Sequence, residues 1–292
     1  MKIKYIVIIL VLFSTIGHAK TMNYIYHGPE TPNDTRFIYE WELLKMALEI
    51  TKDSYGGYVM KPSEKIMNGP RRDAELMKDS GVVTIVLGIG TEERENLLTP
   101  VRIPLDKGLL GYRVFLINKK DKNKFSQIKS LDDLKKLTLG QGLGWGDIKV
   151  WEANGFKVMV GTNYDGLFNM IQTSRFDFFP RGILEIVDEY ETRKEFIPEM
   201  EIEESILVYY PWPRYFFCAN SPEGKMLAER VEVGLLKMID NGEYNKIFEK
   251  HYGYISKKLN LKNRNLFKIT NPLLSSKTPL KNSKLWYDIG QQ

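Results

Sequence analysis

Segments typical of buried β-strands alternate with segments typical of helices along most of this chain. The β-branched run 82–87 and the apolar run 111–117 have the composition of strands that are covered on both faces. Residues 36–51 carry apolar side chains at helical spacing, and residues 70–78 and 164–173 are also expected to be helical. This alternation predicts an α/β protein built from parallel sheet layers.

Shorter segments complete the expected pattern. Ser130 is a typical helix N-cap, with Asp133 three residues later. Further strands are expected at 23–27, 58–60, 137–139, 157–160, 176–179, 206–210 and 215–219, and further helices at 184–193, 225–239 and 244–251. The chain has 292 residues, of which 43% are apolar, so it is long enough to form roughly two domains.

Composition excludes several classes of function. The formal net charge is +5 and the lysines are spread along the chain, so we do not expect a nucleic-acid-binding protein. The single cysteine, Cys218, excludes an internal disulfide and a cysteine-based zinc site. The three histidines show no metal-ligand spacing. We therefore expect no metal and no cofactor, and we assign no catalytic residue.

The first nineteen residues have the three-part pattern of a secretory signal peptide. A basic start with Lys2 and Lys4 precedes the apolar run 6–16, and small residues, Gly17 and Ala19, follow it. The alternative is a membrane anchor, but the run is shorter than the roughly 20 residues of a spanning helix. We therefore expect cleavage after Ala19 and a periplasmic protein, a location that suits a chain with one cysteine.

A glycine-rich loop, Gly140 to Gly146, follows the expected strand 137–139. Its glycine spacing differs from that of a dinucleotide-binding loop. The loop either brings backbone N–H groups to an anion at a helix N-terminus or forms a simple tight turn. Trp145 is expected at the mouth of the site that this loop faces. Aromatic residues also crowd 209–217, where some belong to the core and a few are candidates to line a ligand cleft.

Four motifs occur in a fixed order along residues 23–253. They are Thr91-Glu92-Glu93-Arg94, Ser130-Leu131-Asp132-Asp133-Leu134-Lys135, Thr173-Ser174-Arg175-Phe176-Asp177, and Asp240-Asn241-Gly242-Glu243-Tyr244-Asn245-Lys246-Ile247 with His251-Tyr252-Gly253. In order and spacing, the chain resembles the bacterial extracellular solute-binding proteins of family 3, the amino-acid-binding type of ABC transporter substrate-binding proteins. Residues 254–292 have no counterpart in the typical member of that family.

The resemblance implies a type II periplasmic-binding-protein-like fold, in which two α/β lobes are joined by two crossover strands. Mapped onto this chain, lobe one would consist of residues 20–110 and 213–253, and lobe two of residues 111–212. A ligand is also expected between the lobes on general grounds, because ligands of α/β proteins bind beyond the carboxyl ends of parallel strands. The extension 254–292 holds enough apolar residues that we expect it to pack on a lobe.

The resemblance also implies residues that hold the ligand's carboxylate. The family's arginine matches Arg94, whose planar guanidinium suits bidentate pairing with a carboxylate. The alternative for Arg94 is a surface ion pair with Glu92 or Asp106. The family's second-lobe glycine loop, which donates N–H groups to the same carboxylate, matches Gly142 to Gly144.

One departure from the family bears on the ligand's charge. The acidic residue that holds an α-amine in the family falls here at Gly182, and its neighbour Arg181 is positive. Arg181 faces either the cleft or the lobe surface. If it faces the cleft, two arginines on different lobes favour an anionic solute. Tyr164, Trp145 and Tyr215 are then candidates to cover an apolar or planar part of that solute.

The predicted function is therefore that of a periplasmic binding protein for a small anionic solute, either a carboxylate or an amino-acid-like compound. Its expected partners are this small-molecule ligand and an inner-membrane ABC permease or a sensor, and we expect a monomer. One alternative is an enzyme on the same scaffold, such as a dehydratase, with Glu185 or Asp147 as its acid or base. The other is an interaction protein that has lost its ligand and uses its extension to engage a partner.

Overall fold

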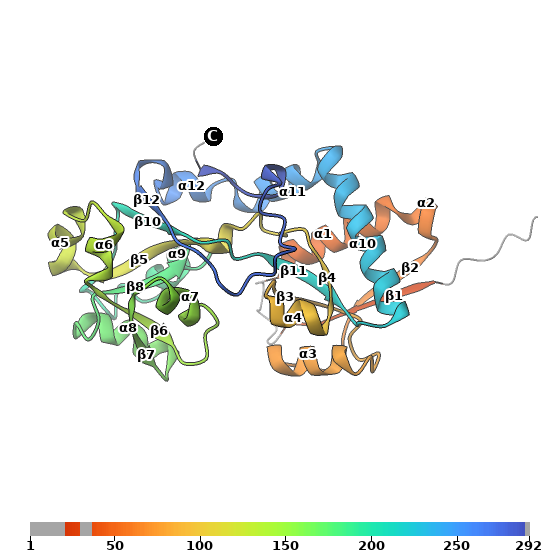
Figure 1. Cartoon of the computed structure of the whole chain (residues 1–292), viewed down its shortest axis with the longest axis horizontal. Helices are drawn as coiled ribbons and strands as arrows, with labels where there is room; N and C mark the ends of the chain where they lie inside the picture. Colours follow the sequence, from red (N-terminus) through yellow and green to blue (C-terminus); the bar gives the residue numbers. More distant parts are fainter. Residues whose placement is uncertain (1–20, 30–36, 290–292) are drawn as a thin grey trace, which may run out of the picture.

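The computed structural model describes residues 21–29 and 37–289, and its two lobes lie side by side along the long axis of the molecule (Figure 1). Each lobe is built on its own β-sheet. The predicted signal peptide, residues 1–19, lies outside the described residues. Within the described ranges, none of the helices has the length and hydropathy of a membrane-spanning segment.

The sheet of lobe one has the strand order β2-β1-β3-β11-β4 among the described residues. Its strands are β1 (Met22–Tyr26), β2 (Tyr58–Pro62), β3 (Ile85–Ile89), β4 (Thr99–Val101) and β11 (Arg214–Cys218). β1 runs parallel to β2 and β3, whereas β11 is antiparallel to β3 and β4. The expected parallel layer is therefore a mixed sheet, because β11 enters it as the chain returns from lobe two.

The sheet of lobe two has the order β12-β10-β5-β8-β6-β7, and β9 pairs with β5. Its strands are β5 (Tyr112–Asn118), β6 (Thr138–Gly142), β7 (Lys157–Gly161), β8 (Phe178–Gly182), β9 (Met200–Ile202), β10 (Ile206–Tyr209) and β12 (Asn265–Lys268). Every residue of β5 is buried, which confirms the prediction made from its apolar composition. β6 is parallel to β7 and β8, and β5 is antiparallel to β8.

Helices cover both sheets, and several begin where their sequence signals predict. In lobe one these are α1 (Ile38–Ile50), α2 (Lys52–Tyr55), α3 (Gly69–Met77), α4 (Glu92–Leu97), α10 (Pro222–Asp240) and α11 (Glu243–Tyr252). In lobe two they are α5 (Lys122–Ser126), α6 (Leu131–Lys135), α7 (Ile148–Ala153), α8 (Tyr164–Gln172) and α9 (Ile186–Glu191). Ser130 caps α6 by accepting a hydrogen bond from the N–H of Asp133, and Pro70 lies in the first turn of α3.

Two of the chain segments that connect the lobes pass close to each other. Tyr210 donates its N–H to the carbonyl oxygen of Gly111 (3.2 Å), and Leu105 donates to that of Arg214 (2.9 Å). A Cβ atom on Gly111 would lie 2.0 Å from the carbonyl oxygen of Tyr210, so only glycine permits this approach. In two-lobed folds, such crossings form the hinge about which the lobes rotate.

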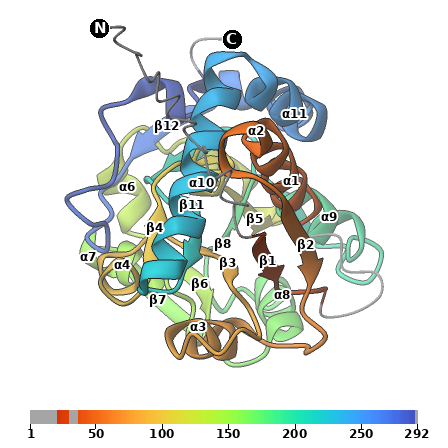
Figure 2. The ribbon, with the colours of Figure 1, turned by 90° about the vertical axis from the view of Figure 1, so that its right-hand side faces the viewer.

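The C-terminal extension contacts both lobes. It begins with α12 (Ile255–Lys258) and then adds β12 to the edge of the lobe-two sheet, parallel to β10. The chain next runs past α7 and α4, as Figure 2 shows, and residues 279–289 pack beside the hinge near Lys107 and Tyr112. Short 3-10 turns occur along the chain at η1 (Leu109–Gly111), η2 (Lys119–Asp121), η3 (Leu261–Asn263) and η4 (Ser283–Leu285).

Candidate functional site

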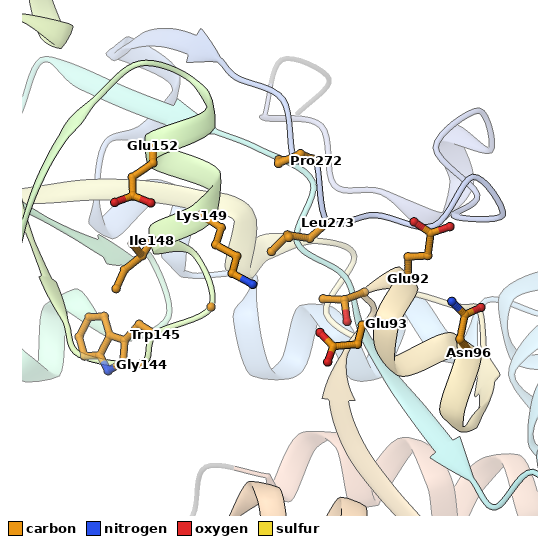
Figure 3. A pocket seen from close by; sticks show the side chains of 12 residues that line it. Glu92, Glu93, Asn96, Gly144, Trp145, Ile148, Lys149, Glu152, Pro272 and Leu273 are labelled. Atoms are coloured by element: carbon orange, nitrogen blue, oxygen red, sulfur yellow. The ribbon is translucent and has the colours of Figure 1, made fainter.

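A groove between the lobes encloses a cavity of about 770 Å³ (Figure 3). Its walls are the first turn of α4 in lobe one, the β6–α7 loop with α7 in lobe two, and the extension at Pro272 and Leu273. α4 follows the carboxyl end of β3, and the β6–α7 loop follows the carboxyl end of β6. The cavity therefore lies where the fold is expected to bind a ligand. Its lining residues are Thr91, Glu92, Glu93, Asn96, Gly144, Trp145, Gly146, Ile148, Lys149, Glu152, Pro272 and Leu273.

The glycine loop forms the lobe-two wall of this groove as a tight turn. Trp145 donates its N–H to the carbonyl oxygen of Gly142 (3.0 Å), and Gly144 has a φ of 80°, which favours glycine. A Cβ atom on Gly142 would lie 2.4 Å from the Trp145 ring, so the indole packs directly on this backbone. The N–H of Leu143 is also used, because it donates to Gly161 (2.9 Å). These contacts favour the tight-turn interpretation over an anion-binding loop.

Trp145 covers a buried arginine instead of standing alone at the groove. Its ring stacks on Phe179 with centroids 5.9 Å apart, and the Arg181 guanidinium lies 4.7 Å from the Trp145 centroid. Arg181 is only 6% exposed and donates two hydrogen bonds to Glu189, at 2.7 and 2.6 Å. The Arg181 side chain therefore lies inside lobe two, behind Trp145, and its charge is neutralised there.

Further groups complete the surroundings of Arg181. Glu185 Oε2 lies 3.1 Å from the guanidinium, and Tyr164 donates its hydroxyl to Glu189 Oε1 (2.5 Å). Burial alone would lower the pKa of Arg181, but the nearby carboxylates of Glu185 and Glu189 raise it above its ordinary value. Burial and the Glu189 carboxylate likewise raise the pKa of Tyr164. Tyr164 is therefore a hydrogen-bond donor within this network, at a half-exposed position.

Arg94 is paired within lobe one. Its guanidinium binds the carboxylate of Asp73 on α3 and lies 5.3 Å from the centroid of the Phe217 ring. The side chain packs on Gly88, where a Cβ would come within 2.3 Å of it. The alternative predicted for Arg94 was an ion pair with Glu92 or Asp106, and the partner is instead Asp73. Arg94 lines a neighbouring cavity of about 410 Å³ between α3 and α4, which shares Thr91 and Glu93 with the groove.

Tyr215 belongs to the core of lobe one. It is fully buried, and its ring occupies the space beside Gly90, where a Cβ would lie 2.4 Å away. Burial, followed by the nearby Glu95 carboxylate, raises the pKa of its hydroxyl. Tyr215 therefore does not line the groove, in contrast to the cleft-facing position that the aromatic cluster suggested.

Four charged side chains line the groove, and sequence reasoning did not select them. Glu92, Glu93, Glu152 and Lys149 make no side-chain hydrogen bond or ion pair with another described residue. In Figure 3, Lys149 extends from α7 towards the opposite wall, where Glu93 lies. Two neighbouring carboxylates such as Glu92 and Glu93 usually lie on solvated surface, and only their position at the start of the helix that carries Arg94 could have indicated a site.

A third cavity, of about 530 Å³, lies at the hinge. It is lined by Phe37, Ile38, Tyr39, Leu110, Leu184, Glu185, Asp188, Arg214, His251 and Tyr252. Glu185 Oε2 lies 3.1 Å from the point that a Cβ on Gly182 would occupy, so a carboxylate stands close to the position of the family's acidic residue. Burial opposes ionisation of Glu185, but Arg181, Arg113 and Arg214 outweigh it and lower its pKa.

Asp147, the other carboxylate considered for catalysis, is bound by two side chains through one of its oxygens. Arg113 lies 3.3 Å from its Oδ2, and Tyr210 donates its hydroxyl to the same oxygen (2.9 Å). All three residues are buried. In the described part of the chain, no group of three or more His, Cys, Asp or Glu residues has the arrangement of a metal site.

Comparison with known proteins relates this geometry to a known fold. No family model matches the sequence, and no curated protein matches it. Among solved structures, the chain is similar to an ancestral arginine-binding protein bound to arginine, with 21% identity and a TM-score of 0.51 over 80% of this chain and 98% of that one.

Two further solved structures have comparable similarity. One comes from work on glutathione import via GshT and the cystine ABC importer of Streptococcus mutans, with 18% identity and a TM-score of 0.50 over 80% of this chain and 95% of the other. The other is a histidine kinase sensor domain with similarity to periplasmic binding proteins, with 12% identity and a TM-score of 0.51 over 81% and 97%. These similarities confirm the predicted fold, a two-lobed α/β fold of the type II periplasmic-binding-protein kind.

Proposed function

We propose that this protein binds a small amino-acid-like solute between its lobes and delivers it to a membrane permease or presents it to a sensor. The observation that carries the proposal is the groove of about 770 Å³, which both lobes line at the carboxyl ends of β3 and β6. The similar structures support a solute-binding role, because they include an arginine-binding protein and a sensor domain. Export to the periplasm and a monomeric state remain predictions from the sequence.

The charges of the groove favour a solute that carries a cation. The anionic solute predicted from the sequence depended on Arg94 and Arg181, and both guanidinium groups already bind carboxylates of their own lobes. Among the described residues, the groove charges without a side-chain partner are instead three carboxylates and the ammonium group of Lys149. A zwitterion fits this arrangement, with its cationic end on Glu93, its anionic end on Lys149 and its apolar part on Trp145.

A role in binding without catalysis is part of the proposal. A general acid or base needs a proton-exchanging group that is free to meet the substrate. Asp147 is held by Arg113 and Tyr210, and the three surrounding arginines keep the pKa of Glu185 below its ordinary value. Asp147 is therefore not free to meet a substrate, and Glu185 is not suited to hold a proton at neutral pH.

The hinge cavity is a second candidate position for the solute's cation. Glu185 provides a carboxylate close to the place where the resemblance puts the partner of an α-amine. One oxygen of this carboxylate accepts a hydrogen bond from the N–H of Gly182 (3.3 Å), and the same oxygen faces Arg181. Because these groups already use the carboxylate, we place the solute in the larger groove and use Glu185 as the comparison in the test.

The test begins with thermal unfolding of the mature protein in the presence of single compounds. The panel holds the twenty amino acids, short dicarboxylates and simple amines, because a ligand that binds only the folded state raises the melting temperature. We expect one or more zwitterionic amino acids to give the largest increase. A larger increase with dicarboxylates would contradict the zwitterion and support the anionic solute instead.

Matched variants then locate the site. With the amino acid that stabilises most, Glu93→Gln should weaken binding about 10- to 100-fold, the usual effect of losing a hydrogen bond to a charged group. Lys149→Met should weaken it similarly. Glu64→Gln, on an exposed residue away from the groove, serves as the control. If Glu185→Gln weakens binding while Glu93→Gln leaves it unchanged, the solute binds at the hinge and not in the groove.

A further inference from the structure

The C-terminal extension is fixed firmly to lobe two before it reaches the groove. β12 pairs with β10 over four residues, from Asn265 opposite Ile206 to Lys268 opposite Tyr209. Arg264, immediately before β12, is buried and donates hydrogen bonds to the carbonyl oxygens of Leu259 and Ile206 at 2.8 and 3.1 Å. This part of the extension therefore moves with lobe two.

At the groove, the extension is bound to both lobes within three residues. On the lobe-two side, Asn154 at the end of α7 makes three hydrogen bonds to Thr270, at 2.7, 3.1 and 3.2 Å. On the lobe-one side, the N–H of Glu92 at the start of α4 donates to the carbonyl oxygen of Leu273 (2.8 Å). Between these two attachments, Pro272 and Leu273 form part of the groove wall.

The short distance along the chain limits how far the two attachments can separate. Three residues of fully extended chain span at most roughly 11 Å. The side chain of Asn271 is also held, because it donates to the carbonyl oxygen of Pro211 in the hinge (2.8 Å). The lobes therefore cannot open widely at this edge of the groove while the hydrogen bonds of Asn154 and Glu92 both persist.

Beyond the groove the extension stays attached to lobe one and the hinge. The Trp286 ring packs against Gly108, where a Cβ would lie 2.5 Å from it. Tyr287 donates its N–H to Lys107 and accepts a hydrogen bond from the Tyr112 hydroxyl, both at 2.8 Å. Leu273 thus lies in the middle of a segment that is anchored on both sides, instead of at a free end.

We propose that residues 264–287 form an inter-lobe strap that limits the opening of the lobes and fixes the width of the groove. The strap makes Asn154 and the backbone N–H of Glu92 positioning groups for the groove wall, because they bind Thr270 and Leu273 on either side of Pro272. This restraint does not depend on the identity of the solute or on the proposed function. The restraint comes from a segment that the typical solute-binding protein of family 3 lacks. The amplitude of hinge motion usual in that family is therefore not expected for this chain.

The single hydrogen bond from Glu92 allows a clean perturbation. Glu92 is the first residue of α4, a position at which proline is well tolerated because its N–H is not needed by the helix. Thr91, which precedes it, has φ −118° and ψ 152°, a conformation compatible with a following proline. Glu92→Pro therefore removes the donor to Leu273 and keeps the helix, and Glu92→Ala is the matched control that keeps the donor.

The measurement is the distance between spin labels on the two lobes, without added ligand. Cysteines at the exposed positions Lys78, beside α3, and Lys157, in β7, place the labels on opposite lobes (Figure 1), and Cys218 is buried and remains unlabelled. We expect one narrow distance distribution for the parent protein and for Glu92→Ala. Glu92→Pro should broaden the distribution and shift it to longer distances.

A second variant tests the same restraint while the backbone N–H of Glu92 is kept. Insertion of three glycines between Pro272 and Leu273 adds roughly 10 Å of reach while the carbonyl group of Leu273 remains available to Glu92. This insertion should also lengthen the inter-lobe distance, and circular dichroism will verify that each variant is folded. Identical distributions for Glu92→Pro, the insertion and the parent would overturn the proposal, whatever solute the protein binds.

Discussion

Replacement of Arg181 by methionine should destabilise the protein by about 3–5 kcal/mol, the usual cost of removing one partner from a buried ion pair. Arg181 and Glu189 are 6% and 8% exposed, and two hydrogen bonds join them. Methionine can still fill the space between the rings of Trp145 and Phe179, whose centroids lie 4.7 and 5.0 Å from the guanidinium. Most of the loss should therefore come from leaving Glu189 buried without its cation.

Urea denaturation followed by circular dichroism measures this loss. In thermal denaturation, the melting temperature should fall by about 6–20 °C, because a domain of this size loses roughly 2–4 °C per kcal/mol. The double variant Arg181→Met/Glu189→Met should regain much of the stability, because an apolar pair of similar volume replaces a buried ion pair at little cost. The comparison separates loss of the charge partner from loss of packing.

Arg193→Met is the matched control on the same lobe. Arg193 also pairs with a carboxylate, but its partner Asp165 is 76% exposed, so the loss should stay within about 1 kcal/mol. The reasoning is refuted if Arg181→Met costs no more than the Arg193 variant, or if the double variant is less stable than the single one. Arg181→Met should also leave the preference among solutes unchanged, whereas an arginine that faced the cleft would alter it.

Asp106, Gly142 and the Arg94–Asp73 pair allow three more tests. Burial, opposed by Arg214 but supported by Glu40, raises the pKa of Asp106 from 3.8 to about 6, so the folded state holds its proton over a range where the unfolded chain has lost it. The free energy of unfolding should therefore be unaffected by this group below pH 4 and fall by about 3 kcal/mol as the pH rises to 6. In urea titrations at a series of pH values, Asp106→Asn should lack that decline. A variant whose free energy of unfolding falls with pH as steeply as that of the parent would contradict this prediction. Gly142→Ala would place a Cβ 2.4 Å from the Trp145 ring, so it should shift the fluorescence of Trp145 and lower stability by about 1–3 kcal/mol, the usual cost of overpacking. If the Arg94–Asp73 pair is only structural, Arg94→Ala and Asp73→Asn should destabilise the protein by similar amounts. If Arg94 exchanges Asp73 for a solute carboxylate, Asp73→Asn should tighten solute binding and Arg94→Ala should weaken it.

The sequence was most informative where a local signal determines structure. Ser130 and Pro70 each marked a helix start, because capping and proline geometry depend only on neighbouring residues. The start of β3 was predicted too early, at 82 instead of Ile85. Thr84 holds the chain before the strand through hydrogen bonds to Ile25 and Asn23, and contacts over about sixty residues leave no local signal.

The carboxylates that pair with the two arginines could not be predicted from local sequence either. The resemblance selected Arg94 and Arg181, but it could not indicate that Asp73 on α3 or Glu189 on α9 would neutralise them. Glu189 lies eight residues from Arg181, across the turn from β8 into α9, so helical periodicity alone does not bring them together. The groove charges of Glu92, Glu93, Lys149 and Glu152 likewise give no signal in the sequence, because charged residues on helices usually face solvent.

The two predicted arginines differ in what a ligand could do to them. The side chains of Arg181 and Glu189 are 8% and 10% exposed, so a solute carboxylate that displaced Glu189 would leave a buried charge without a partner. The side chains of Arg94 and Asp73 are 21% and 26% exposed, and a released Asp73 could be hydrated. Exchange of partners is therefore open to Arg94 and closed to Arg181. Of these two arginines, only Arg94 is suited to bind an anionic group of the solute, and that group must reach beyond the groove towards the cavity between α3 and α4.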